Sequence, residues 1–92
     1  MIVDHAFEDG VLHVSLLRDL DVTSRGAAFL ETEALVHSHR PRLVRVQLPT
    51  ADPSPASLSA LCRARRLCEN LRIPFTVVGP VRVAVRVPEA VP

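Results

Sequence analysis

Apolar and polar residues alternate near the start of the chain in the pattern of β-strands. The segment VLHVSLL, which begins at Val11, has one fully apolar face. That face consists of Leu12, Val14 and Leu16. The preceding segment IVDHAF alternates less regularly and predicts a short edge strand. A turn signal, Glu8 to Gly10, separates the two segments, so together they predict a β-hairpin.

Two later segments also predict strands. RLVRVQL, from Arg42, places Val44, Val46 and Leu48 toward a core, with Arg45 and Gln47 on the opposite side. IPFTVVGP predicts a short buried strand that ends at Gly79-Pro80. Because a central parallel strand covered on both faces is apolar throughout, the polar side of RLVRVQL indicates that helices cover mainly one face of the sheet.

A first helix is predicted between the second and third strands. Asp21, Thr23 or Ser24 could cap it, since their side-chain oxygens can accept from free amides of the first turn. Pro41 ends it, after about His37. The apolar positions expected to be buried are Ala27, Leu30 and Ala34, with help from Phe29 and Val36.

A second helix follows the loop PTADPSP. Ser54 is placed as its N-cap, with Pro55 at the first helical position. The predicted apolar stripe comprises Leu58, Leu61, Ala64, Cys68 and Leu71. The resulting order, β-β-α-β-α-β, predicts one α/β domain over residues 1–92. Its sheet is mixed and mostly parallel, with an N-terminal hairpin and helices packed mainly on one face.

Composition narrows the classes of function. The chain has 92 residues, enough for one small domain, and 48% of them are apolar. Its net charge of +1 argues against a nucleic-acid partner. No apolar run approaches a membrane span, and the acidic N-terminus lacks the basic start of a secretory signal, so we expect a cytoplasmic protein. Cys62 and Cys68 point to different helix faces and are expected to be reduced.

Three segments together resemble the STAS domain of bacterial anti-sigma-factor antagonists, over about Gly10 to Pro80. VLHVSLLRDLDVTS looks like the family's strand and following turn, with Leu20 and Asp21 kept. RLVRVQL is similar to its central strand. LSALCRARRLCENLRIPFTVVGP is similar to its second helix, the next strand and the Gly-Pro exit.

The resemblance implies a small module that docks on a protein partner. In the family, that partner is an anti-sigma kinase with an ATPase fold. The kinase phosphorylates a serine at the start of the second helix, in an Asp-Ser-x-Gly-like motif. The unmodified form binds the kinase and frees the sigma factor, and the added phosphate disrupts docking through charge and bulk.

This chain departs from that motif. Alignment from either side puts the family's serine position on Pro55 or Ala56, and neither residue can be phosphorylated. The acid position falls on Ser54 or Pro55, and the glycine position on Ser57 or Leu58. Arg18 and Gln47 also replace a family glycine and aspartate. Ser54 and Ser57 are the only nearby hydroxyls. They are possible phosphosites, but both fit structural roles at the helix start.

Enzyme signatures are missing from the sequence, so we expect neither catalysis nor a cofactor. His5, His13, His37 and His39 are scattered and do not suggest a metal site. Asp19 and Asp21 fit turn and capping roles. The basic run Arg63 to Arg66 fits either a solvated helix face or a surface that docks an acidic patch.

We therefore expect a regulatory, non-catalytic module that binds an anti-sigma factor or kinase-type ATPase without phosphorylation. The residues expected to carry this contact are Asp21, Thr23, Asp52, Ser54, Pro55, Ala56, Ser57 and Arg63. An alternative is a structural subunit that forms a homo-oligomer or part of a larger complex. A third interpretation, a domain that binds a small molecule, would require a pocket.

The tail leaves one structural choice open. VRVAVRV alternates strictly, which favours a strand over residues 81–88, whereas the STAS family usually has a helix there. An extra strand at the sheet edge could pair with a second chain and form a dimer.

Overall fold

The chain folds into the predicted order of strands and helices. The computed structural model describes residues 2–79. Its elements are β1 (Val3–Glu8), β2 (Val11–Leu16), α1 (Arg25–His39), β3 (Leu43–Gln47), α2 (Pro55–Asn70) and β4 (Phe75–Val78). Residues 81–88, for which strand and helix were both open, lie outside the described residues.

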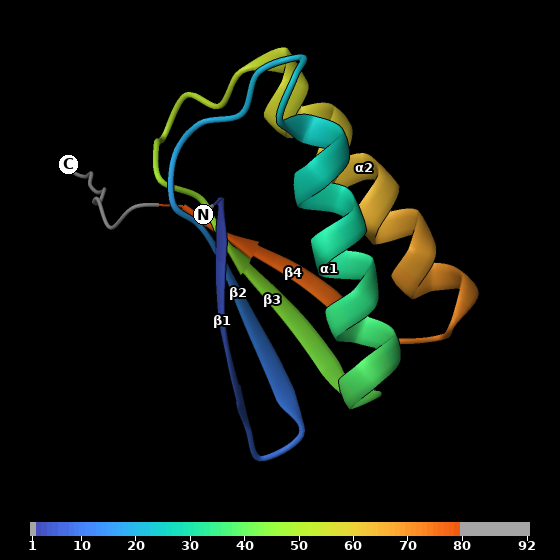
Figure 1. Ribbon diagram of the computed structural model, residues 1–92. Coiled ribbons are helices and arrows are strands. Elements are labelled where there is room, and N and C mark those ends of the chain that lie inside the picture. Colours follow the sequence, from blue (N-terminus) through green and yellow to red (C-terminus); the bar gives the residue numbers. More distant parts are fainter. Residues whose placement is uncertain (1, 80–92) are drawn as a thin grey trace, which may run out of the picture.

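The described strands form one mixed sheet in the order β1-β2-β3-β4. β1 and β2 are antiparallel, whereas β2 pairs with β3, and β3 with β4, in parallel. Both parallel connections step across the sheet in the same direction. Since such connections are right-handed, α1 and α2 lie on the same face (Figure 1). The predicted α/β architecture, with a hairpin edge and helices on one face, is confirmed.

The β1–β2 turn depends on a glycine. Asp9 and Gly10 both have positive φ angles, 53° and 79°, as tight two-residue hairpin loops require. Arg42, at the start of β3, donates from its backbone N–H to the Gly10 carbonyl at 2.8 Å and from Nε to the Asp9 carbonyl at 2.8 Å. These two hydrogen bonds attach the turn to the start of β3. A Cβ at position 10 would lie only 3.1 Å from the Arg42 side chain, so glycine also leaves room for this contact.

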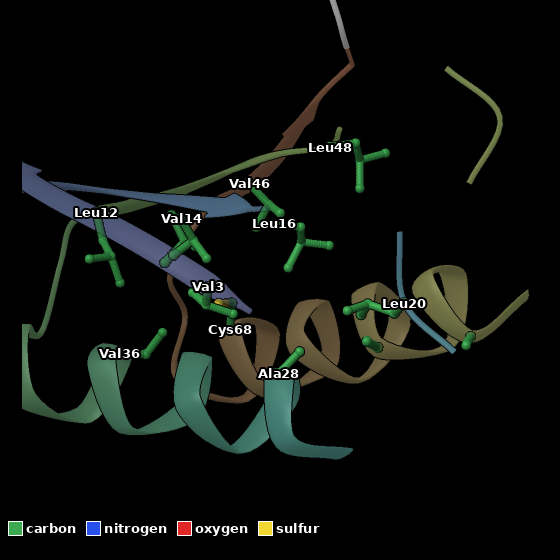
Figure 2. Close-up of a cluster of buried hydrophobic side chains, with 13 residues drawn as sticks. Val3, Leu12, Val14, Leu16, Leu20, Ala28, Val36, Val46, Leu48 and Cys68 are labelled. Carbon is green, nitrogen blue, oxygen red and sulfur yellow. The ribbon is translucent and has the colours of Figure 1, made fainter. Parts of the chain in front are cut away.

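The core lies between the sheet and the two helices. The predicted apolar faces of β2 and β3 are confirmed, because Leu12, Val14, Val44 and Val46 are all buried. Figure 2 shows strand side chains and α1 side chains pointing into this one layer. The remaining core members include Val3, Leu16, Leu20, Ala28, Val36, Leu48, Ala56, Ala60 and Cys68.

The predicted buried face of α1 is wrong by about one position. Ala27, Leu30 and Ala34 are exposed and Phe29 is half-buried. The buried residues are Ala28, Thr32 and Val36, of which only Val36 was predicted. These three are four residues apart and so share one face. Thr32 can lie in the core because its hydroxyl donates to the Ala28 carbonyl at 2.9 Å, which satisfies the polar group. This hydrogen bond within the helix therefore allows Thr32, a polar residue, to lie on the buried face of α1.

The predicted stripe of α2 is correct in part. Ala64 and Cys68 are buried, but Leu58 and Leu71 are exposed and Leu61 is only partly buried. Small residues, Ala56, Ser57 and Ala60, take the inward positions of the first half of the helix. Short side chains let the start of α2 approach its neighbours closely. At the other end, burial raises the pKa of the Cys68 thiol to about 11.

The strand predicted for IPFTVVGP is confirmed as β4, but its predicted burial is wrong. Thr76 and Val77 of β4 are exposed, while Phe75 and Val78 are half-buried. The reason is position: β4 pairs only with β3 among the described strands and so forms an edge of the described sheet. An edge strand lacks the neighbour that would cover its outer side.

Each helix is followed within two residues by an arginine in the left-handed region of backbone conformation. Arg40 has φ 48° and Arg72 has φ 60°. Helices commonly end in this conformation, but the residue is usually glycine because a Cβ there costs about 1–2 kcal/mol. The Arg40 backbone N–H donates to the Val36 carbonyl at 2.9 Å, and that of Arg72 to the Glu69 carbonyl at 3.1 Å.

Glycine at these positions should stabilise the fold. Relief of the left-handed cost is partly offset by the greater freedom of glycine in the unfolded chain, so we expect Arg40→Gly and Arg72→Gly each to add about 0.5–1 kcal/mol to the free energy of unfolding. Urea unfolding measures this gain. Arg66→Gly, inside α2, is the matched control and should cost about 1 kcal/mol. A loss of stability at positions 40 and 72 would contradict the conformational argument.

Candidate functional site

Two loops meet at the end of the sheet opposite the β1–β2 turn. Residues 17–24 follow β2 and residues 48–54 follow β3, and Figure 1 shows both loops at the N-terminal ends of the two helices. The carboxyl ends of parallel strands are where open α/β proteins usually place binding sites. We call residues 17–24 and 48–58 the double-loop site.

Ser54 starts α2 as the sequence predicts. Its backbone is extended, with φ −67° and ψ 162°, and its Oγ accepts from the Ser57 backbone N–H at 3.1 Å. Pro55 occupies the first helical turn, where its lack of an N–H costs nothing. The Ser54 hydroxyl donates to the Leu20 carbonyl at 2.6 Å, so the helix cap is also bonded to the other loop.

Ser57 is fully buried, with 0% of its surface exposed. Its hydroxyl donates to Asp19 Oδ1 at 2.5 Å and accepts from the Leu20 backbone N–H at 2.9 Å. Asp19 Oδ1 also accepts from the Ser54 backbone N–H at 3.1 Å. We call Asp19, Leu20, Ser54 and Ser57 the Asp19–serine cluster. It joins the loop after β2 to the start of α2.

A second hydrogen-bonded pair shapes the start of α1. Asp21 Oδ1 accepts from the Ser24 backbone N–H at 2.8 Å, and Ser24 Oγ accepts from the Asp21 backbone N–H at 3.0 Å. This reciprocal arrangement has the geometry of a capping box. Of the three predicted caps, Asp21 is therefore the one that caps the turn leading into α1. Ser24 completes the box, and the Thr23 side chain forms no described hydrogen bond.

Hydrogen bonds hold both aspartates in the charged form. The Ser57 hydroxyl, followed by the Ser54 backbone N–H, lowers the pKa of Asp19 below its ordinary value. The Ser24 backbone N–H and hydroxyl lower the pKa of Asp21 in the same way. These two carboxylates act as acceptors for local donors, which is a structural role.

The structure brings most of the expected contact residues together, but not all are accessible. Asp21, Thr23, Asp52 and Pro55 are exposed on the double-loop site, whereas Ala56 and Ser57 face the interior and Ser54 is half-buried. Arg63 lies two turns further along α2. Its guanidinium carbon is 4.3 Å from the ring centre of Phe29, a cation–π contact between the two helices.

Sequence reasoning gave Asp19 only a turn role and missed its place in the cluster. The missing information was spatial, since its bonds to Ser54 and Ser57 span 35 and 38 positions. The sequence did contain one indication of the cluster. It has an acceptor, Asp19, in the loop after one strand and two hydroxyl donors, Ser54 and Ser57, at the start of the second predicted helix.

The two loops and the start of α2 also carry exposed apolar side chains. Val22 is 75% exposed, Leu17 52% and Leu58 49%. Exposed large apolar side chains near one another often mark a protein-binding surface. The double-loop site therefore combines a rigid polar interior with an apolar and acidic exterior.

Comparison of the sequence with protein-family models finds no match, and comparison with curated proteins finds none either. Within residues 2–79, no three His, Cys, Asp or Glu side chains gather closely enough to hold a metal ion. Neither described helix is long and apolar enough to cross a membrane.

The Asp19–serine cluster predicts a specific dependence of stability on pH. Because the pKa of Asp19 is lowered on folding, its stabilisation is complete above the ordinary value of 3.8 and is lost as the pH falls through the folded value. Asp19→Asn should therefore be less stable than the parent chain at neutral pH, and the difference should narrow below about pH 4. Urea midpoints across this range measure it.

Asp52→Asn is the matched control, because no described hydrogen bond ends on the Asp52 carboxylate although the residue lies on the same site. It should change the urea midpoint little. A difference between Asp19→Asn and the parent chain that is equal at neutral and acid pH would argue against charge-dependent bonding in the cluster.

Proposed function

We propose that this chain is a non-catalytic protein-binding module that docks through the double-loop site. The resemblance to STAS domains supplies the partner class, an anti-sigma factor or a kinase-type ATPase. Docking at this end of the fold agrees with that resemblance, because the loops and the start of the second helix form the family's contact surface. The activity belongs to the regulation of transcription in a bacterial cell.

One observation supports docking without a phosphorylation switch. The hydroxyls of Ser54 and Ser57 are both used inside the protein, and Ser57 is completely buried. A kinase would have to open the Asp19–serine cluster to reach Ser57, and a phosphate there would lie beside the Asp19 carboxylate. The residues at the family's serine position, Pro55 and Ala56, carry no hydroxyl.

The surface chemistry also describes the partner. Val22, Leu17 and Leu58 provide exposed apolar area, and Asp19, Asp21 and Asp52 provide negative charge around it. Arg18 is the one basic residue of the double-loop site. A partner surface with an apolar centre and basic groups at its rim would match this arrangement.

We place this function in the cytoplasm. Cys62 is exposed and Cys68 is buried, and both are free thiols in the structure. An exposed free thiol suits a reducing compartment better than an oxidising one.

A homo-oligomeric assembly role is the second candidate. β1, a strand of six residues, lies at one edge of the described sheet. An open edge can pair with a strand of another chain. Asp4 and Glu8 lie on this strand, and charges there oppose such pairing. The mass in solution separates the two functions: a stable homo-oligomer favours assembly, and a monomer that changes mass only with an ATPase favours regulation.

An affinity capture with matched variants tests the proposal. Tagged parent chain and Leu30→Asp, which alters an apolar residue of α1 outside the site, should recover an anti-sigma protein of ATPase fold from bacterial lysate. Val22→Asp should bind that protein at least about tenfold more weakly, since it puts a charge into the apolar contact. Mass spectrometry identifies the partner, and titration of the purified pair gives the affinities.

The serine variants complete this test. Ser57→Ala should lower the free energy of unfolding by about 1–2 kcal/mol, because it removes the buried hydroxyl that donates to Asp19 and accepts from the Leu20 N–H. Ser54→Ala should cost about 1 kcal/mol as a lost N-cap. Both should keep the affinity for the partner. Recovery of the chain alone, or of a form phosphorylated on either serine that no longer binds, would overturn the proposal.

A further inference from the structure

A cleft lies at the other end of the helical layer, where α1 and α2 terminate. Its volume is about 490 Å³. The residues that line it are Val36, His37, Arg40, Pro41, Leu71, Arg72 and Ile73. They come from the last turn of α1, the residues after it and the connection from α2 to β4. None belongs to the double-loop site, so the cleft is independent of the proposed docking function.

The size of the cleft suits a small molecule. Ligand pockets in proteins typically have volumes of about 300–1,000 Å³. The space between α1 and α2, lined by Ala28, Phe29 and Ala64 among others, measures only about 20 Å³ and is filled by side chains. Two shallower hollows over α2, beside Arg63 and beside Cys62, each measure about 240 Å³. The cleft between the helix ends is about twice that size and falls within the range of ligand pockets.

Basic side chains dominate the polar lining of the cleft. Arg40, Arg72 and His37 line it, and none of the described lining residues is acidic. A guanidinium group binds carboxylate or phosphate through paired hydrogen bonds. Neither arginine forms a described ion pair, since the one described salt bridge joins Arg65 to Glu69. The cleft thus gathers positive charge that no described acid balances.

The helix ends do not cancel this charge. Carbonyl groups at a helix C-terminus carry partial negative charge, about half an elementary charge for the whole end. Here several of them accept backbone N–H groups: Val36 from Arg40 at 2.9 Å, and Cys68 from Ile73 at 2.8 Å. Two full guanidinium charges exceed what remains of these dipoles.

Backbone conformation gives a second, independent sign of function. Arg40, the C-cap of α1, and Arg72, the residue after the C-cap of α2, both have positive φ, and both line this one cleft. Glycine would be more stable at each position. Energetically unfavourable backbone conformations cluster at binding sites, where the side chain they present is needed. Two such residues of the same type at one cleft point to a shared ligand.

The apolar part of the lining defines the rest of the ligand. Val36 is buried, Ile73 is half-buried, and Leu71 is 42% exposed. We propose that the cleft binds a small organic anion, with an apolar body against Val36, Leu71 and Ile73 and a carboxylate or phosphate group between Arg40 and Arg72. This is the small-molecule interpretation that the sequence left without a pocket.

Nuclear magnetic resonance with simple probes tests the site. The full ¹⁵N-labelled chain is titrated with phenyl phosphate and with phenylpropionate, which share an apolar ring and differ in their anion. Both should shift the amide signals of Arg40, Arg72 and Ile73, with a dissociation constant on the order of 1 mM, as their size allows. Inorganic phosphate and phenol, each carrying half of the chemistry, should bind at least about tenfold more weakly.

Variants connect the binding to the arginines. The double variant Arg40→Gln/Arg72→Gln should weaken phenyl phosphate binding at least about tenfold, while Arg45→Gln, the same change on the open face of the sheet, should leave it unchanged. Arg40→Gly/Arg72→Gly should lose binding and yet unfold at a higher temperature, which separates lost binding from lost folding.

Two results would overturn the proposal. One is a set of shifts at the double-loop site or scattered over the surface instead of at the cleft. The other is an affinity of the double glutamine variant equal to that of Arg45→Gln. A preference for only one of the two probes would assign the anion as phosphate or carboxylate and would support the site.

Discussion

The hydrogen bonds that converge on Asp19 Oδ1 hold together the end of the fold where the two loops meet. This oxygen accepts from the Ser57 hydroxyl, the Ser54 backbone N–H and the Leu20 backbone N–H. Leu20 is almost fully buried, and Figure 2 shows it beside the first turns of α2. Burial of that loop residue requires partners for its backbone groups, and the serines of α2 provide them.

This cluster explains why a serine near a helix start need not be a regulatory site. In a phosphorylation switch, the hydroxyl must be accessible and its modification must alter a surface. Here the two hydroxyls satisfy buried or half-buried backbone groups of another loop. The same end of the fold therefore keeps the proposed docking surface, with Val22 and Leu58 exposed, while its serines stabilise that surface from within.

Local patterns predicted those parts of the structure that depend on neighbours in sequence. The hairpin, the buried face of β2 and the Ser54 cap all follow from residues within a few positions of each other. The rotation of α1 did not, because Ala27 and Ala28 are equally apolar and Thr32 enters the core through its own hydrogen bond. The Asp19–serine cluster could not be predicted either, because its members are far apart in sequence and come together only in the folded sheet.

The cluster is the central claim, and a double-mutant cycle on Asp19→Asn and Ser57→Ala tests it most directly. Urea unfolding of the parent chain, both single variants and the double variant at neutral pH gives the coupling between the two side chains. If they act as one unit, the double variant unfolds at the same urea concentration as the less stable single variant. If the two losses simply add, the side chains act independently, and the account of this site is wrong.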